Sequence, residues 1–334
     1  MNLSTEEKDI EISQPPTDTV SELAFSPQAD YLAASSWDNN VRIWEIQSNG
    51  VSTGKAMYSH EGPALCCAWS TDGTKLASGG VDKAGRLFDL ASGKSTQVAA
   101  HDAAIRCVKF VEAPGSASPI LVTGSWDKTI KYWDLRSQAP IGSVTLPERC
   151  YAMDVLHPLL VVGTSDKKVV VFDLNNPTTI FKTMQSSLKH QTRSLSCFRT
   201  KDGFAISSIE GRIGIQYFQD TEPKKSFSFK AHREKENFFP INSTSFHPGY
   251  GSLLTAGSDG SMITWDKDAR TRIKSFPSVN TPITSTCFNK TGNILAYSVG
   301  YDWSKGLQSS TQNDKKTIFL HSVKEPEVKT KAAN

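Results

Sequence analysis

The chain has 334 residues, of which 38% are hydrophobic and 21% charged, and its formal net charge is +3. This length fits two ordinary domains or one large closed all-β fold, and either can bury a large core. The small net charge excludes a strong overall attraction to nucleic acid, so any such affinity must come from a local basic patch.

The N-terminal stretch MNLSTEEKDI is acidic and has no apolar segment, which argues against a signal peptide. No apolar run reaches the roughly 18 residues of a membrane-spanning helix, so we expect no membrane insertion. Six cysteines occur without a CxxC pair, and most lie inside apolar runs. We therefore expect an intracellular protein with buried, free thiols, and a disordered N-terminus over residues 1–8.

An acidic turn residue recurs along the chain with spacings of 44, 45, 39, 44, 49 and 43 residues. The seven positions are Asp38, Asp82, Asp127, Asp166, Glu210, Asp259 and Asp302. In most units an alternating run that closes on an aromatic follows the turn, as in IKYW (130–133), and a similar run precedes it, as in IRCVKF (105–110). A more polar run such as IGSVTL (141–146) completes the unit. Four strands in roughly 40–45 residues indicate one blade of a β-propeller.

In chain order, the expected blades cover residues 20–58, 64–101, 104–146, 150–186, 192–231, 240–276 and 281–321. The last unit lacks a fourth strand, whereas DIEIS (9–13) stands alone before the first unit. We expect residues 9–13 to complete the last blade, which would close the ring without an open seam. The sequence thus predicts an all-β, seven-bladed propeller over residues 9–323. The polar tail, 324–334, is expected to be disordered.

The stretches SWDNNVRIWEI, GSWDKTIKYWDL and GSDGSMITWDKD resemble WD40 repeats, and this resemblance covers nearly the whole chain. It implies a buried hydrogen-bond chain that runs from His through Ser or Thr to Asp and Trp. The matching residues are His60, Ser78 and Asp82 in the second unit, and His101, Thr123, Asp127 and Trp133 in the third. Such sets also look like hydrolase triads, but a catalytic set is not expected to recur from blade to blade.

Motifs of cofactor and metal sites are missing from the sequence. It contains no GxxxxGK[ST] loop, no HExxH and no Cys/His spacing suited to zinc. We therefore expect no catalytic residue, no metal and no cofactor. A rigid ring that displays loops is typical of a binding module.

Functional constraints are expected where a repeat rule is broken. In SSIEGRIGIQYF (207–218), Glu210, Gly211 and Arg212 replace the usual Asp turn. This is either a degenerate blade with a solvated arginine or an anchor for a partner carboxylate, which arginine binds in bidentate fashion. A second break follows His232, where an insertion of about five residues ends in two phenylalanines and suits either an interface or a plain longer loop.

A third break combines WDKDARTRIK (265–274) with SFSFK (226–230), and thus basic residues with aromatic ones. A groove for single-stranded nucleic acid needs positive charge for phosphates and rings for base stacking. The alternative is an ordinary solvated strand connection with buried aromatic side chains.

These breaks, together with ERCYAMDV (148–155), KHQTRSLSCF (189–198) and YDWSKG (301–306), resemble the messenger-RNA export factors of the nuclear pore. That family binds an acidic hairpin segment, called GLEBS, of an FG nucleoporin. The resemblance implies a GLEBS contact at Arg212 and Glu210. It implies a single-stranded RNA groove at Phe229, Trp265, Asp266, Lys267, Arg270 and Arg272. Asp266 is unusual in such a groove, where it would position Arg270 or read a base edge.

The resemblance further implies a monomeric propeller in a heterodimer with the nucleoporin, located at the nuclear envelope, in the nucleus and in the cytoplasm. Two alternatives stay open at this point. The related spindle-checkpoint propeller binds GLEBS segments of mitotic kinases, and other WD40 propellers serve as substrate receptors of ubiquitin ligases.

Overall fold

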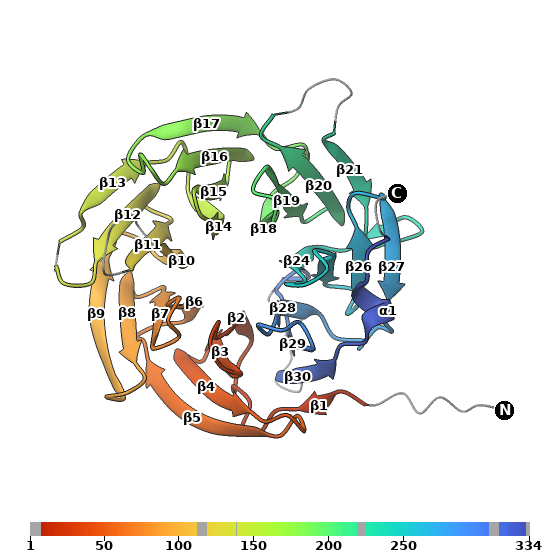
Figure 1. Cartoon of the computed structure of the whole chain (residues 1–334), viewed down its shortest axis with the longest axis horizontal. Helices are drawn as coiled ribbons and strands as arrows, with labels where there is room; N and C mark the ends of the chain where they lie inside the picture. Colours follow the sequence, from red (N-terminus) through yellow and green to blue (C-terminus); the bar gives the residue numbers. More distant parts are fainter. Residues whose placement is uncertain (1–7, 112–118, 138, 220–224, 307–313, 332–334) are drawn as a thin grey trace.

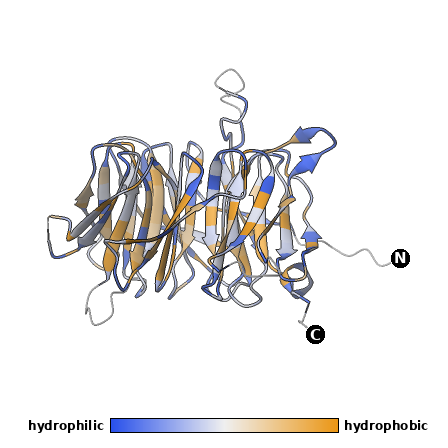
Figure 2. Cartoon of the chain, turned by 90° about the horizontal axis from the view of Figure 1, so that it is seen from above, coloured by the Kyte–Doolittle hydropathy of each residue, from blue (hydrophilic) through white to orange (hydrophobic). Residues whose placement is uncertain are grey.

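The computed structural model describes residues 8–111, 119–137, 139–219, 225–306 and 314–331. Within these ranges, seven four-stranded antiparallel sheets surround a central axis like the blades of a propeller (Figure 1). Seen edge on, the ring is a flat disc with loops on both faces (Figure 2). The predicted all-β, seven-bladed propeller is confirmed. The predicted disordered N-terminus lies outside the described residues, except for Lys8.

The first three blades follow the chain from the innermost strand to the outermost. Blade one contains β2 (Val20–Phe25), β3 (Tyr31–Ser36), β4 (Asn40–Ile46) and β5 (Ser52–Ser59). Blade two contains β6 (Ala64–Trp69), β7 (Lys75–Gly80), β8 (Ala84–Asp89) and β9 (Lys94–Ala100). Blade three contains β10 (Ile105–Val111), β11 (Ile120–Ser125), β12 (Thr129–Asp134) and β13 (Gly142–Thr145).

The next three blades repeat this order. Blade four contains β14 (Cys150–Leu156), β15 (Leu159–Thr164), β16 (Lys168–Asp173) and β17 (Ile180–Gln185). Blade five contains β18 (Thr192–Cys197), β19 (Gly203–Ser208), β20 (Arg212–Tyr217) and β21 (Phe227–Lys230). A short hairpin of β22 (Arg233–Glu234) and β23 (Asn237–Phe238) then leads into blade six. Blade six contains β24 (Ile241–Phe246), β25 (Leu253–Gly257), β26 (Met262–Asp266) and β27 (Thr271–Ser275).

The seventh blade joins the two ends of the chain. It contains β28 (Ile283–Phe288), β29 (Ile294–Val299), β30 (Thr317–Ser322) and, as its outer strand, β1 (Ile10–Glu11). The register pairs Ile10 with Leu320, and the N–H of Ile12 donates to the carbonyl of Ile318 at 3.0 Å. The predicted closure of the ring by the N-terminal strand is thereby confirmed.

The hydrophobic core lies between neighbouring blades, because each sheet buries both faces against the next sheet. One cluster, for example, joins Val41 and Ile43 of blade one to Trp69, Leu76 and Phe88 of blade two. Strands of alternating or wholly apolar residues supply such faces, which explains the pattern read from the sequence. A single blade has no core of its own, so the closed ring is the unit that folds.

The C-terminal segment differs from the prediction of a disordered tail, because residues 324–331 are ordered and only 332–334 lie outside the description. A short helix, α1 (Glu325–Val328), begins where the Glu327 carboxylate accepts the N–H of Lys324 at 2.9 Å. Val328 is 2% exposed, and the hydroxyl of Thr264 on β26 donates to the carbonyl of Glu327 at 2.5 Å. The segment is polar, but this one apolar anchor and its main-chain hydrogen bonds fix it on blade six.

His321 on β30 links both ends of the chain. Its Nδ1 lies 2.7 Å from the Asp9 carboxylate before β1, and its Nε2 lies 3.0 Å from the Glu327 carboxylate in α1. Burial alone would lower the pKa of His321, but the hydrogen bonds and charges of the two carboxylates outweigh it and raise this pKa to about 9. The histidine is therefore charged at neutral pH and ties the N-terminal strand to the C-terminal helix.

We predict that His321→Gln destabilises the protein at pH 6 by about 1–3 kcal/mol. A raised folded-state pKa gives stability that is complete below the unfolded-state value of about 6.5 and is lost as the pH rises through the folded-state value. The difference in unfolding free energy between wild type and variant should thus shrink from pH 6 to pH 9.5. His190→Gln, at a histidine whose side chain is 58% exposed, is the control. A His321→Gln effect that is constant with pH would contradict this assignment.

Candidate functional site

Blade three contains the complete hydrogen-bond chain expected of its repeat. Nδ1 of His101 lies 2.8 Å from the Asp127 carboxylate, and Nε2 lies 2.7 Å from the Thr123 hydroxyl. The Trp133 indole N–H donates to the same hydroxyl at 2.8 Å. This hydrogen-bond chain connects the loop after the outer strand of blade two to β11 and β12, so it fixes the position of that loop.

Blade two forms the same chain with a different last member. His60 contacts Asp82 at 2.9 Å and Ser78 at 2.8 Å, but Phe88 occupies the position of the tryptophan. The Tyr58 hydroxyl donates to Ser78 at 2.9 Å instead. Burial lowers the pKa of His60 and of His101, although the neighbouring aspartates oppose this effect. Both histidines are buried inside loop-to-strand contacts, which is the arrangement of a structural element.

A third hydrogen-bond chain, in blade six, was not predicted from the sequence. His232 contacts Asp259 at 2.9 Å and Thr255 at 2.9 Å, and the Trp265 indole N–H donates to Thr255 at 3.0 Å. The insertion after His232 hid it, because it displaces this histidine from the spacing seen in blades two and three. The stretch GSDGSMITW (257–265) contains the turn aspartate and the tryptophan, and it could have indicated this hydrogen-bond chain. Trp265 therefore has a structural partner in addition to the RNA-binding role that the resemblance implies.

The blade-five turn packs against the loop that holds His232. Gly211 has a φ of +68°, and a Cβ atom there would lie 2.4 Å from the His232 carbonyl. The carbonyl of Gly211 accepts the N–H of Ala231 at 2.9 Å. Only glycine combines this φ with so close an approach of two backbones. The turn that breaks the repeat therefore packs closely against the loop that leads from blade five to blade six.

The side chains of Arg212 and Glu210, both at this turn, have different surroundings. Glu210 accepts the N–H of Lys189 at 3.2 Å and lies 3.9 Å from His190, so it holds the preceding loop. Arg212 is half-buried on β20, where its guanidinium donates to the Ser228 hydroxyl at 3.1 Å. Within the described ranges, no carboxylate forms an ion pair with Arg212. The remaining N–H groups of this guanidinium are available to another acceptor.

The β22–β23 hairpin extends the surface next to this turn. The N–H of Phe239, just after the hairpin, donates to the carbonyl of His232 at 3.1 Å, so the hairpin starts and ends beside Gly211. Phe238 is 56% exposed, and the Arg233 guanidinium lies 5.5 Å from its ring centre. An exposed aromatic next to cations is a composition typical of interfaces.

The aromatic and basic residues of blades five and six form one cluster. The rings of Phe229 and Trp265 lie 4.8 Å apart at 58°. The Lys267 ammonium lies 4.8 Å from the ring centre of Phe198, and the Arg270 guanidinium lies 4.3 Å above Phe227. These contacts bring Phe229, Trp265, Lys267 and Arg270 to one part of the surface. Arg272 is exposed on β27, in register with Trp265.

Charge in this cluster is partly compensated within the chain. Lys267 is 9% exposed at its side chain and pairs with Asp268 at 2.6 Å. Burial opposes its charge, but the hydrogen bond and charge of Asp268 raise the pKa of Lys267 overall. Arg270 and Arg272 are the exposed cations of the cluster. They, more than Lys267, are placed to meet a phosphate from solvent.

Asp266 departs from the expectation that it positions Arg270 or reads a base edge. It is 3% exposed, and its carboxylate accepts the N–H groups of Asp268 at 3.0 Å, Ala269 at 2.9 Å and Lys331 at 3.0 Å. Arg270 lies over Phe227 instead. Three main-chain donors thus satisfy a carboxylate that would otherwise be costly to bury. Its task is to shape the β26–β27 turn and hold the C-terminal segment.

Two general features of the molecule bear on its chemistry. No group of three or more His, Cys, Asp and Glu side chains among the described residues is placed to hold a metal ion. In the same part of the chain, no helix is long and apolar enough to cross a membrane.

Comparison with known proteins places the chain among WD40 proteins. The family model "WD domain, G-beta repeat" matches residues 10–45, 52–89, 93–134 and 223–266. The "Poly(A)+ RNA export protein" of Schizosaccharomyces pombe is 54% identical, over 96% of this chain and 92% of that protein. The "mRNA export factor GLE2" of Chaetomium thermophilum is 50% identical, over 94% of this chain and 90% of that protein. "Protein Rae1" of Drosophila melanogaster is 45% identical, over 94% of each.

We predict that Trp265→Phe lowers the free energy of unfolding by about 1–2 kcal/mol, because it keeps a six-membered aromatic ring but removes the indole N–H that donates to Thr255. Chemical denaturation measures this change. The matched control is Trp126→Phe, at a tryptophan that is 36% exposed, which should cost less than about 0.5 kcal/mol. Equal stability losses in the two variants would argue against a structural role of the Trp265 indole N–H.

Proposed function

Because this chain belongs to the WD40-repeat family of messenger-RNA export factors, we propose that it is a non-enzymatic adaptor in mRNA export. It binds the acidic GLEBS segment of an FG nucleoporin at the blade-five turn, and single-stranded RNA at the cluster of blades five and six. The observation that carries the proposal is the match over almost the full length to relatives whose names state RNA or mRNA export. The adaptor acts as a monomeric propeller in a heterodimer, at the nuclear pore and on both sides of the nuclear envelope.

The charges around the blade-five turn favour an acidic partner there. Arg212 and Lys230 face each other across β20 and β21, and Arg233 begins the neighbouring hairpin. Arg212 has a neutral hydroxyl as its intramolecular partner, so its charge is left for an external carboxylate. Arginine suits this role because its planar fork matches a carboxylate in two parallel hydrogen bonds.

We predict that Arg212→Ala weakens binding of a nucleoporin GLEBS peptide at least tenfold in calorimetric titration. If Arg212 pairs with a buried glutamate of the peptide, the loss should be about 2–5 kcal/mol, since the glutamate is left unpaired. The control is Arg136→Ala, at an arginine that is 69% exposed and pairs with Asp134, which should bind like the wild type. Unchanged affinity in Arg212→Ala would remove the site. If the wild type binds only kinase GLEBS segments, the nucleoporin assignment would be wrong.

Single-stranded RNA fits the second cluster for a separate reason. Phe227, Phe229 and Trp265 are half-buried, so part of each side chain is open to a base while the rest stays packed. Arg270 and Arg272 add two exposed cations next to these rings. Aromatic rings and backbone charges together bind single strands with little sequence preference.

For RNA, we predict that Arg270→Ala and Arg272→Ala each weaken binding of oligoadenylate and oligouridylate by a similar factor. Each variant should also reduce the slope of log affinity against log salt by about 0.7, the value for one lost phosphate contact on a single strand. Fluorescence anisotropy at several salt concentrations measures both effects, with Arg136→Ala as control. An unchanged slope in both variants would place the RNA elsewhere on the molecule.

A further inference from the structure

The innermost strand of every blade carries a β-bulge near its start. In β10, for example, Ile105 pairs with Ser125 and Cys107 with Gly124, which leaves Arg106 as the extra residue. Bulges re-aim a side chain, and they are frequent at functional sites. The equivalent residues of the seven blades form what we call the bulge ring, and all line one cavity: Ser21, Leu65, Arg106, Tyr151, Arg193, Asn242 and Thr284.

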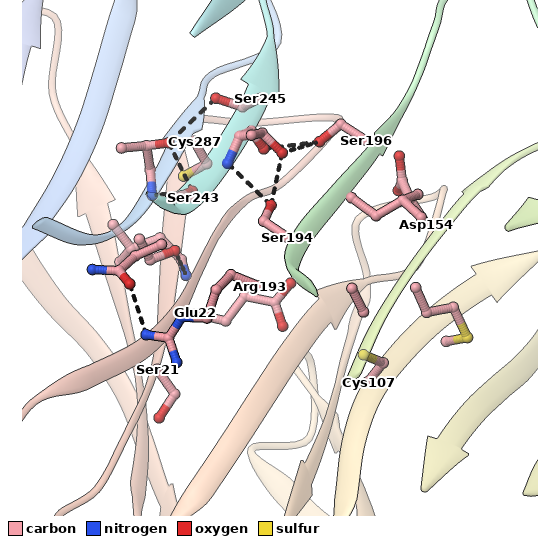
Figure 3. A pocket seen from close by; sticks show the side chains of 18 of the residues that line it. Ser21, Glu22, Cys107, Asp154, Arg193, Ser194, Ser196, Ser243, Ser245 and Cys287 are labelled. Carbon is pink, nitrogen blue, oxygen red and sulfur yellow. Dashed lines mark hydrogen bonds between the residues drawn. The ribbon is translucent and has the colours of Figure 1, made fainter. Parts of the chain in front are cut away.

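The bulge ring lies where two cavities of the central channel meet. A cavity of about 380 Å³ lies on one side, and one of about 350 Å³ on the other. Every member of the ring except Leu65 lines both cavities. Figure 3 shows the cavity of about 350 Å³, with Arg193 and Ser21 among its lining side chains. A molecule in the channel would therefore meet the bulge ring from either side.

The two arginines of the bulge ring are poorly paired. Arg193 donates to the Asn242 side-chain oxygen at 2.6 Å, and Arg106 donates to the Leu65 carbonyl at 3.5 Å. Neither forms an ion pair with any described residue, whereas Lys109 deeper in the channel lies 3.3 Å from the Glu22 carboxylate. Burial lowers the pKa of Arg193, Asp302 opposes this, and the charge of Arg106 lowers it again. The two guanidiniums thus repel each other across a half-buried space.

The remaining members of the bulge ring carry no negative charge, and the side-chain donors of Ser21 and Asn242 are already bonded within the chain. Tyr151 lies on the blade between the two arginines, and its hydroxyl has no hydrogen-bond partner within the described ranges. The acids that line the two cavities, Glu22, Asp154 and Asp302, are engaged within the chain, and Asp154 accepts the N–H of Cys197 at 2.8 Å. Glu22 pairs with Lys109, and Asp302 accepts hydrogen bonds from Asn242 and Ser258. The bulge ring consequently carries two positive charges that form no ion pair among the described residues, although the charges of Glu22 and Asp302 act on them from within the channel.

We propose that the bulge ring binds the phosphate group of a small molecule inside the central channel. Two guanidiniums and a phenol from three neighbouring blades line the same two cavities, and donors on three sides suit a tetrahedral oxyanion better than a planar carboxylate. The charge of the two arginines matches that of a phosphate monoester. Glu22 and Asp302, which line the two cavities, disfavour longer polyphosphates by repulsion.

The test is a calorimetric titration of the full chain with inorganic phosphate, comparing the wild type with the double variant Arg106→Gln, Arg193→Gln. We expect affinity to fall at least tenfold, since both charge-assisted contacts are lost. Arg136→Gln is the matched control on the outer surface. Phosphate should also raise the melting temperature of the wild type and not that of the double variant. The single variant Arg193→Gln gives the same comparison if the double variant does not fold.

Acetate, titrated in parallel, is the probe for a carboxylate site. The proposal is overturned if acetate binds as tightly as phosphate, or if the double variant binds phosphate like the wild type. It is also overturned if the wild type binds no phosphate at about 10 mM, where a millimolar site would be mostly filled. A phosphoserine peptide separates the sources. Tighter binding of this peptide than of inorganic phosphate, lost in the double variant, would show that the phosphate group belongs to a phosphorylated protein and not to a small molecule.

Discussion

The pairing of β1 with β30 is the constraint on which the rest of the structure depends. It places both ends of the chain in one sheet and closes the ring, so that each blade has a neighbour on both sides. The paired strand is only two residues long, and the closure therefore needs further contacts. Burial of Ile12 and the bridge from Asp9 through His321 to Glu327 supply them. The central channel and the loop-bearing faces exist only because this seam is shut.

The fold could be predicted from the sequence because every blade repeats the same physical task. The turn aspartate, the alternating strands and the closing aromatic recur with a nearly constant spacing, and each has one structural reason. The ordered C-terminal segment could not be predicted in this way. Its order depends on one buried side chain, Val328, and on hydrogen bonds to Thr264 and Asp266. Such contacts between distant segments have no periodic signature.

The candidate site was predictable only where it breaks the repeat. Arg212 stands out because it belongs to the Glu210, Gly211 and Arg212 turn that replaces the usual Asp turn, and its guanidinium has no acidic partner among the described residues. Asp266 and Trp265 were assigned by resemblance, and the structure shows contacts that resemblance could not reveal. The bulge ring has no sequence signal at all, because its seven members share a backbone position but no chemistry. Only the register of the strands brings them together.

The breaks in the repeat gather on blades five and six, and we infer that this part of the molecule holds the partners. Hydrogen–deuterium exchange on the chain alone and with a nucleoporin GLEBS peptide tests this most directly. The account predicts new protection at residues 207–218 and 231–239, where the blade-five turn meets the β22–β23 hairpin. In blades one to three, apart from their loops, the peptide should change the exchange rates less than in these two segments. Protection confined to other blades, with both of these segments unchanged, would contradict the account.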